Sequence, residues 1–137
     1  MANLRTLHFL VGFAFSPGPG ATKEILLVKK KRPTDQAGLL NGAGGEIEGK
    51  ETPEQAMNRE GKEETALDLE WEGFCTFGGT TADGHEFICH ALRALDVHNL
   101  HEARALTDEE IVILPVPEVF DHPHVEDLKH LVPMALS

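Results

Sequence analysis

The segment from residue 41 to residue 67 constrains the fold of this chain more than any other. Four glycines occur in the nine residues from Asn41 to Gly49, so the backbone there is expected to adopt conformations that other residues resist. Directly after it, the run T-P-E-Q at residues 52–55 has the pattern of a helix start, with threonine as N-cap, proline next and glutamine closing a capping box. The sequence therefore predicts a glycine-rich loop that leads into a helix from Pro53 to about Leu67.

Apolar segments with strand character lie on both sides of this loop and helix. Residues 7, 9, 11, 13 and 15 are all apolar, and this period of two predicts a strand with one buried face. A Pro/Gly turn at Ser16–Gly20 then predicts a hairpin with the next strand. Further strands are expected at Glu24–Lys30, Leu69–Phe77, Glu86–Leu92 and Ile111–Val116, and a closing helix at Val125–Leu136. This order predicts an α/β fold, with a mixed β-sheet between helices, in one domain that spans all 137 residues, 1–137.

Three glutamates share one arc of the predicted helix. Glu60, Glu63 and Glu64 are spaced i, i+3 and i+4. Like charges at these spacings repel by a few tenths of a kcal/mol per pair, so the helix gains nothing by aligning them. One reading is a solvated acidic face; the other is that a cation compensates the charge.

The spacing of residues upstream of these glutamates favours the second interpretation, a bound cation. Seven residues stand in a fixed pattern over 23 positions: Gly45, Glu51, Arg59, Glu60, Glu63, Glu64 and Leu67. This pattern resembles the Nudix box, and it departs from that motif at two positions. Gly61 stands where a bulky apolar residue is expected, so the space beneath the helix is unfilled unless a neighbouring side chain occupies it. Ala66 stands where glycine is expected, and we interpret this as a turn that needs no positive φ.

The resemblance implies a Nudix-type α/β/α sandwich and a Mg²⁺-dependent (or Mn²⁺-dependent) hydrolase of diphosphate linkages. Mg²⁺ prefers hard oxygen ligands, which suits a glutamate cluster beside a backbone carbonyl. By resemblance, the main metal ligands are Glu60 and Glu64, with the Gly44 carbonyl as another and Glu63 as a ligand or water-orienting group. Glu51 and Arg59 are expected to form a salt bridge that holds the loop to the helix.

The general base is left open between a box glutamate, Glu63 or Glu64, and a carboxylate on a later loop. Glu86, Glu102, Asp108, Glu109 and Glu110 compete for the latter role. The run from Thr107 to Glu110 precedes a strand, as such a carboxylate often does in this family, so Glu109 is selected. A solvated turn is the other interpretation of this run.

Two further segments point to the substrate. Residues 40–45 and 127–136 are similar to segments of Nudix enzymes that act on nucleoside triphosphates, including oxidised purine ones. The preferred reaction is therefore a nucleoside triphosphate giving monophosphate and pyrophosphate. The alternatives are ADP-ribose or dinucleoside polyphosphate hydrolysis, or a non-catalytic Nudix-like module that binds nucleotides or a protein.

Three residues are predicted to bind the substrate. Asn41 and Asp127 could read a purine edge, although Asn41 could equally serve the turn before Gly42. Arg32 follows two lysines at a strand end and could meet the phosphates, although a basic strand end also discourages edge-to-edge association.

Composition limits the partners. The chain has 12 basic and 23 acidic residues and a formal charge of -11, which argues against binding duplex nucleic acid. Cys75 and Cys89 are read as reduced core cysteines of a cytoplasmic protein, since zinc-site spacing with His85 and His90 is missing. No apolar stretch approaches the roughly 20 residues that cross a bilayer, so no membrane partner is expected. A homodimer is left open.

Overall fold

The computed structural model describes residues 5–19 and 22–137. Its strands are β1 (Leu7–Phe15), β2 (Glu24–Lys29), β3 (Leu40–Asn41), β4 (Glu72–Thr80), β5 (Glu86–Ala94) and β6 (Glu110–Pro115), and its α-helices are α1 (Pro53–Thr65) and α2 (Leu128–Leu136). Part of the predicted turn at Ser16–Gly20 lies outside the described residues. In the described part of the chain, no helix is both long and apolar enough to cross a bilayer.

The sheet is mixed, as the sequence predicts. Its order is β3-β2-β1-β5-β4, with β6 paired to β2. The main partner of β1 is β5, in parallel register from Leu7 to Ala14, whereas the β1–β2 hairpin pairs only at Ala14 and Phe15. Beyond that point the glycine-rich loop takes the place of β2 beside β1, since Ala43 bridges Gly12. The loop is therefore fixed against the middle of a core strand.

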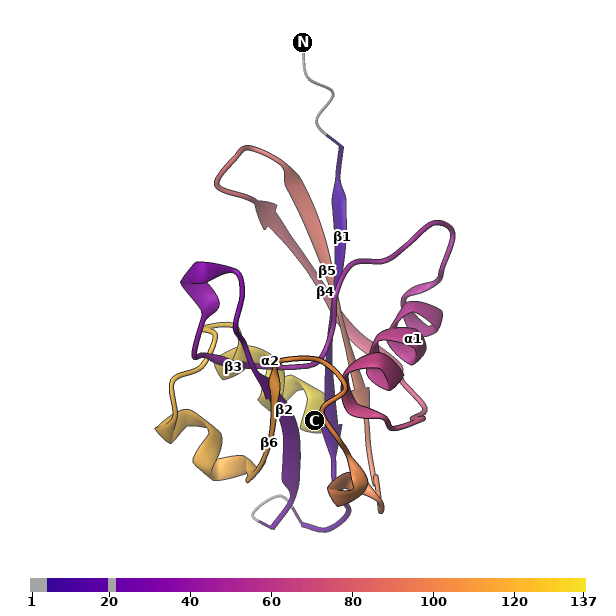
Figure 1. Cartoon of the computed structure of the whole chain (residues 1–137), viewed down its shortest axis with the longest axis vertical. Helices are drawn as coiled ribbons and strands as arrows, with labels where there is room; N and C mark the ends of the chain where they lie inside the picture. The colour runs from indigo at the N-terminus through magenta and orange to yellow at the C-terminus, as the bar shows by residue number, and fades with distance from the viewer. Residues whose placement is uncertain (1–4, 20–21) are drawn as a thin grey trace.

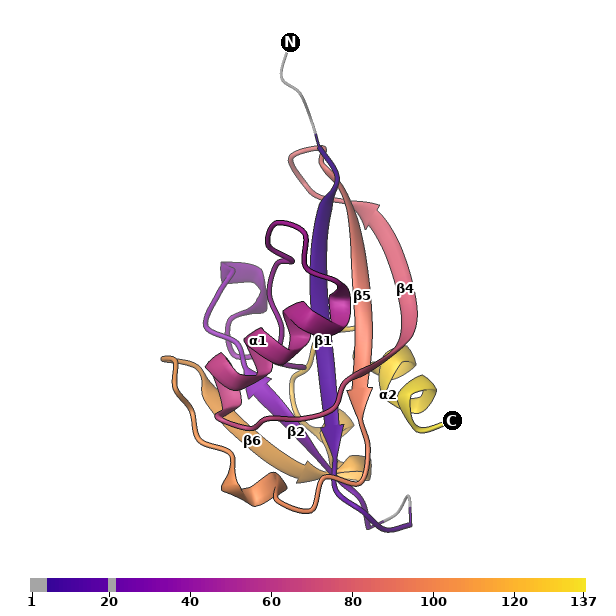
Figure 2. The same ribbon diagram turned by 90° about the vertical axis from the view of Figure 1, so that its right-hand side faces the viewer.

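The two helices lie on opposite faces of the sheet (Figures 1 and 2). Helix α1 contacts β1, β4 and β5, and α2 contacts β4 and β5, which confirms the predicted α/β/α sandwich. The prediction that β1 buries one face is wrong, because a helix covers each face. Phe13 and Phe15 pack with Leu131 of α2, and Leu10 packs with Met57 of α1.

Helix α1 begins where the sequence predicts and ends two residues earlier. The capping box is present in both directions, between Thr52 and Gln55. The helix ends at Thr65 because Ala66 adopts a left-handed conformation, with φ 65°, from which its N–H donates to the carbonyl of Lys62. The prediction that residue 66 needs no positive φ is therefore wrong. This chain keeps the left-handed turn that glycine usually makes, at an energetic cost.

We expect Ala66→Gly to stabilise the protein by about 0.5–1 kcal/mol, because glycine adopts positive φ without the clash of a Cβ. Urea unfolding measures this change. The control is Ala103→Gly, because Ala103 has φ -59° and gains nothing from the substitution. In Ala103→Gly, the greater conformational freedom of the unfolded chain should lower the stability of the protein. A loss of stability in both variants would contradict a strained turn at residue 66.

Candidate active site

An arginine on α1 ties the glycine-rich loop to the helix. The Nε of Arg59 donates to Oε2 of Glu51 at 2.9 Å and its Nη2 donates to Oε1 at 3.0 Å, a two-bond geometry that fixes both side chains. The Nη2 group also donates to the carbonyl of Glu46 at 3.3 Å. This pairing holds the pKa of Glu51 below its ordinary value. The structure thus joins the two residues that the sequence analysis paired.

The three glutamates of α1 divide into two groups. Glu64 accepts a hydrogen bond from the N–H of Gly44 at 2.7 Å. Glu60 lies so close to Gly45 that a Cβ there would stand 2.6 Å from its Oε1. Glu63 is 56% exposed and lies 3.5 Å from Arg59, which also contacts Glu60 at 3.0 Å. Two of the three carboxylates therefore point at the glycine-rich loop, and the third faces outward.

The loop presents a backbone carbonyl at the same place. The carbonyls of Ala43 and Gly45 accept hydrogen bonds from the N–H groups of Gly12 and Leu10 on β1, at 2.6 and 2.8 Å. Between them, the carbonyl of Gly44 accepts no hydrogen bond from any described residue. A backbone carbonyl without a partner in the described part of the chain therefore lies in the residue whose N–H donates to Glu64.

The carboxylates of this cluster are poorly neutralised. Burial raises the pKa of Glu64 to about 7, and the charges of Glu60 and Glu109 add to the rise, while Lys30 and the Gly44 N–H oppose it. Burial also raises the pKa of Glu60 above its ordinary value. Hard oxygen donors whose negative charge Arg59 and Lys30 only partly compensate suit a divalent cation such as Mg²⁺. Within residues 5–19 and 22–137, however, no three acidic, histidine or cysteine side chains converge into a ready-made metal cluster.

A second carboxylate reaches this region from the loop before β6. Glu109 is 7% exposed, its Oε1 lies 3.3 Å from Nζ of Lys30, and its Oε2 accepts from the N–H of Lys31 at 2.7 Å. Its charge adds to the rise in the pKa of Glu64, and its partner Lys30 lines a pocket beside the glycine-rich loop. Asp108 beside it instead pairs with Arg32 at 2.7 Å, on the exposed surface.

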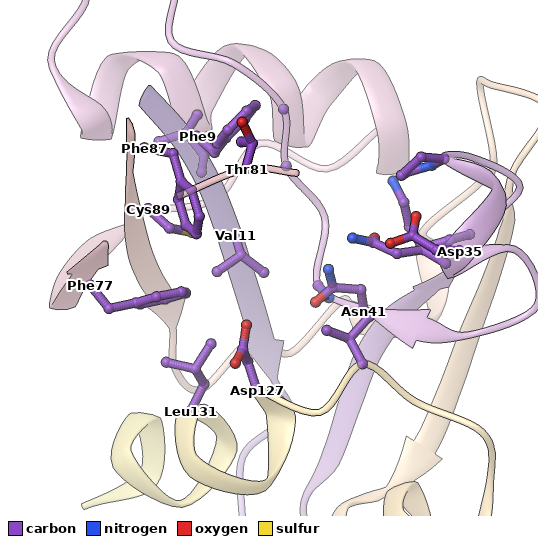
Figure 3. A pocket seen from close by; sticks show the side chains of 18 of the residues that line it. Phe9, Val11, Asp35, Asn41, Phe77, Thr81, Phe87, Cys89, Asp127 and Leu131 are labelled. Atoms are coloured by element: carbon purple, nitrogen blue, oxygen red, sulfur yellow. The ribbon is translucent and has the colours of Figure 1, made fainter. Parts of the chain in front are cut away.

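A pocket of about 640 Å³ opens beside the glycine-rich loop (Figure 3). Gly44, Gly45 and Lys30 line it, and so do Asn41 and Asp127. Its apolar wall consists of Phe9, Val11, Phe77, Phe87, Cys89 and Leu131. This volume suits a nucleotide-sized ligand.

The structure does not bring every predicted substrate residue to this pocket. Arg32 is 66% exposed, pairs with Asp108 and does not line the cavity, whereas Lys30 does. Asn41 lines the pocket and also serves its own turn, because its Oδ1 accepts from the N–H of Gly42 at 2.8 Å. Its Nδ2 donor and the second lone pair of Oδ1 are therefore left for a ligand. Asp127, directly before α2, offers an acceptor.

Sequence reasoning missed several pocket residues. Phe87 and Cys89 alternate along β5, so the period of two could have placed them on one face. Asp35 and Gln36 line the pocket from a short 3-10 turn at Thr34–Gln36, where no periodic signal exists.

The chain is similar to a known family and to known proteins. The model of the NUDIX domain matches residues 14–134. The CTP pyrophosphohydrolase of Escherichia coli (strain K12) is 33% identical over 86 residues, which cover 61% of this chain and 64% of that protein. The chain thus matches less than two thirds of this relative's length.

Solved structures share the fold. The NUDIX domain of Shewanella oneidensis NrtR, complexed with ADP ribose, superposes with a TM-score of 0.80 at 22% identity, covering 96% of this chain and 86% of that one. NrtR complexed with a 27mer DNA superposes with a TM-score of 0.71 at 23% identity, covering 93% of this chain and 59% of that one. Because one structural neighbour binds DNA, the expectation that this chain binds no duplex nucleic acid stays a prediction.

Proposed function

This chain belongs to the Nudix family, and we propose that it hydrolyses the diphosphate linkage of a nucleoside triphosphate, giving a monophosphate and pyrophosphate, with the help of a divalent cation. One observation carries the proposal. The partly buried carboxylates of Glu60 and Glu64 contact the glycine-rich loop, whose residues Gly44 and Gly45 line a nucleotide-sized pocket together with Lys30.

Glu60, Glu64 and the carbonyl of Gly44 would hold the cation, Mg²⁺ or Mn²⁺. Glu63 could join them or orient water, if its side chain leaves Arg59. The bound cation would offset the charge of the diphosphate and lower the pKa of the attacking water.

The other residues of the site bind, orient or accept protons. Lys30 places a positive charge in the pocket, where the phosphates would lie. The Glu51–Arg59 pair keeps the loop in register with α1. For the general base we propose Glu109, with Glu63 and Glu64 as the alternatives, because Glu109 is buried beside Lys30.

We propose that Asn41 and Asp127 read the base. The Nδ2 of Asn41 donates and the carboxylate of Asp127 accepts, so the pair suits a base edge that has an acceptor beside a donor. Purines have such an edge, and cytosine has one too. The name of the E. coli relative makes CTP the competing substrate.

We expect Asn41→Ala and Asp127→Ala each to raise KM for the best nucleoside triphosphate by about tenfold, the value of one lost hydrogen bond. Hydrolysis of a polyphosphate ester that lacks a base should change little. Steady-state kinetics on both substrates measure this difference. Glu126→Ala is the matched control, because Glu126 is 87% exposed and does not line the pocket. Unchanged base preference in both variants would remove these residues from base recognition.

Two other functions are compatible with the family assignment: hydrolysis of a different substrate, and nucleotide binding without catalysis. The ADP ribose bound to the NrtR NUDIX domain favours ADP-ribose hydrolysis as the second candidate. The test is a panel of nucleotides with Mg²⁺ or with chelator, with detection of pyrophosphate and of the nucleoside monophosphate, because ADP-ribose would release AMP and ribose 5-phosphate without pyrophosphate. Pyrophosphate from one triphosphate, released only with metal, supports the proposal. ADP-ribose as the best substrate would replace it, and binding without turnover would indicate a non-catalytic module.

A further inference from the structure

The space beneath Gly61 is not empty. A Cβ on Gly61 would lie 3.2 Å from Nε1 and 3.3 Å from Cζ2 of Trp71. On the opposite side, a Cβ on Gly12 of β1 would lie 2.8 Å from Cζ3 of the same indole. Trp71 therefore lies in a slot between α1 and β1, and both walls of the slot have a glycine at the contact. The bulky side chain expected on α1 is supplied from residue 71 instead.

We infer that Trp71 is a positioning residue for the carboxylates of α1. The inference rests on the proposed function, because it assigns those carboxylates to the metal. Gly61 directly follows Glu60 and precedes Glu64 by less than one helical turn, so the indole supports the helix at the height of both side chains. If the indole were removed, α1 could settle toward β1.

The contacts of both glutamates leave little room for such a movement. Glu64 reaches the Gly44 N–H at 2.7 Å, and the carboxylate of Glu60 occupies the space where Gly45 would carry a Cβ. A shift of α1 by a fraction of an ångström would therefore change both distances. Residues that orient metal ligands typically affect metal affinity or activity by about 10- to 100-fold.

The slot requires an apolar filler of the right volume, and not an indole in particular. The Nε1 of Trp71 is buried, and no hydrogen-bond partner for it is found among the described residues. An unpaired buried N–H opposes burial, so Trp71→Phe should be tolerated. By the same reasoning, a leucine placed on α1 should replace a lost indole.

The experiment compares the wild type with Trp71→Ala, Gly61→Leu and the double variant that carries both changes. Calorimetry measures the Kd for Mn²⁺ alone, and kinetics measure kcat and KM for the best nucleotide. Trp71→Ala should weaken Mn²⁺ binding and lower kcat by at least about tenfold, with KM for nucleotide changed much less. Gly61→Leu should also be impaired, because its side chain meets the indole. The double variant should recover most of both losses.

Val119→Ala is the control for a loss of stability alone, because Val119 is fully buried in the core on the α2 side. It should lower Tm without changing the Kd for Mn²⁺. If Trp71→Ala does not fold, Trp71→Phe and Trp71→Leu take its place. Trp71→Phe should be tolerated, whereas Trp71→Leu should show a smaller loss of Mn²⁺ binding and of kcat than is expected for Trp71→Ala.

Two results would overturn the positioning role: a folded Trp71→Ala protein with the wild-type Kd for Mn²⁺, or a double variant no better than Trp71→Ala. A wild type that binds no Mn²⁺ would overturn it as well, together with the metal site. If the wild type binds Mn²⁺ but hydrolyses no nucleotide, the proposed function fails, while the Kd values still decide the role of Trp71.

Discussion

Glu64→Gln is expected to lower hydrolysis by at least about 100-fold and, in the absence of metal, to make the protein more stable. The first effect follows from the loss of a charged ligand for the cation. The second follows because Glu64 is a largely desolvated carboxylate that feels the charges of Glu60 and Glu109, with one hydrogen bond from Gly44. Glutamine has the same shape, still accepts that bond, and brings no charge into the cluster.

The gain in stability should depend on pH. The pKa of Glu64 is raised to about 7 in the folded protein, above the value of about 4.3 for an exposed glutamate. Between these two values the folded protein keeps a proton that the unfolded chain releases, so the carboxylate weakens the fold progressively as pH rises. The penalty is absent below pH 4, complete above pH 7, and worth up to about 3 kcal/mol.

Unfolding of metal-free protein at pH 5 and at pH 8 measures this dependence. Glu64→Gln should gain stability over the wild type mainly at pH 8. Glu63→Gln is the matched control, because its carboxylate is 56% exposed and its removal should change Tm little. Added Mg²⁺ should stabilise the wild type more than Glu64→Gln, since a ligand that binds only the folded state raises stability. An equal or lower Tm for the glutamine variant at pH 8 would show that the carboxylates do not repel.

The sequence was most informative where structure depends on neighbouring residues. The start of α1 follows from four consecutive residues, 52–55, and the direction of Glu60 and Glu64 follows from helical spacing. Long-range partners were not predictable in the same way. Whether Lys30 or Arg32 enters the pocket depends on two acidic residues nearly 80 positions later, Glu109 and Asp108.

The two departures from the family pattern show the same limit. At residue 66, alanine was read as a turn without positive φ, but the tertiary structure imposes φ 65° on it. At residue 61, the glycine left open whether another side chain fills the space beneath the helix, and Trp71, ten positions away, fills it. A motif describes one element, whereas the packing around that element is supplied by distant parts of the chain.

The other large effect is expected at Glu109. Glu109→Ala should lower the free energy of unfolding by roughly 3 kcal/mol, because it leaves the Lys30 ammonium and the Lys31 N–H without their carboxylate at a buried position. Glu109→Gln should cost less, since the amide oxygen can still accept from Lys31. Urea unfolding of both variants measures the difference. Asp108→Ala is the matched control, because its ion pair with Arg32 is exposed and should matter little to stability.

Kinetics on the same variants test whether Glu109 is the general base. If it accepts the proton of the attacking water, Glu109→Gln should lower kcat by about 100-fold or more. The Glu109→Gln protein should still be folded, and Asp108→Ala should remain active. Both oxygens of Glu109 already accept hydrogen bonds, Oε1 from the Lys30 ammonium and Oε2 from the backbone N–H of Lys31, so proton transfer requires Oε1 to exchange Lys30 for water. Substrate phosphates would favour that exchange by attracting the Lys30 ammonium. A kcat for Glu109→Gln within about threefold of the wild type would leave Glu109 as the anchor of Lys30 and assign the base to Glu63 or Glu64.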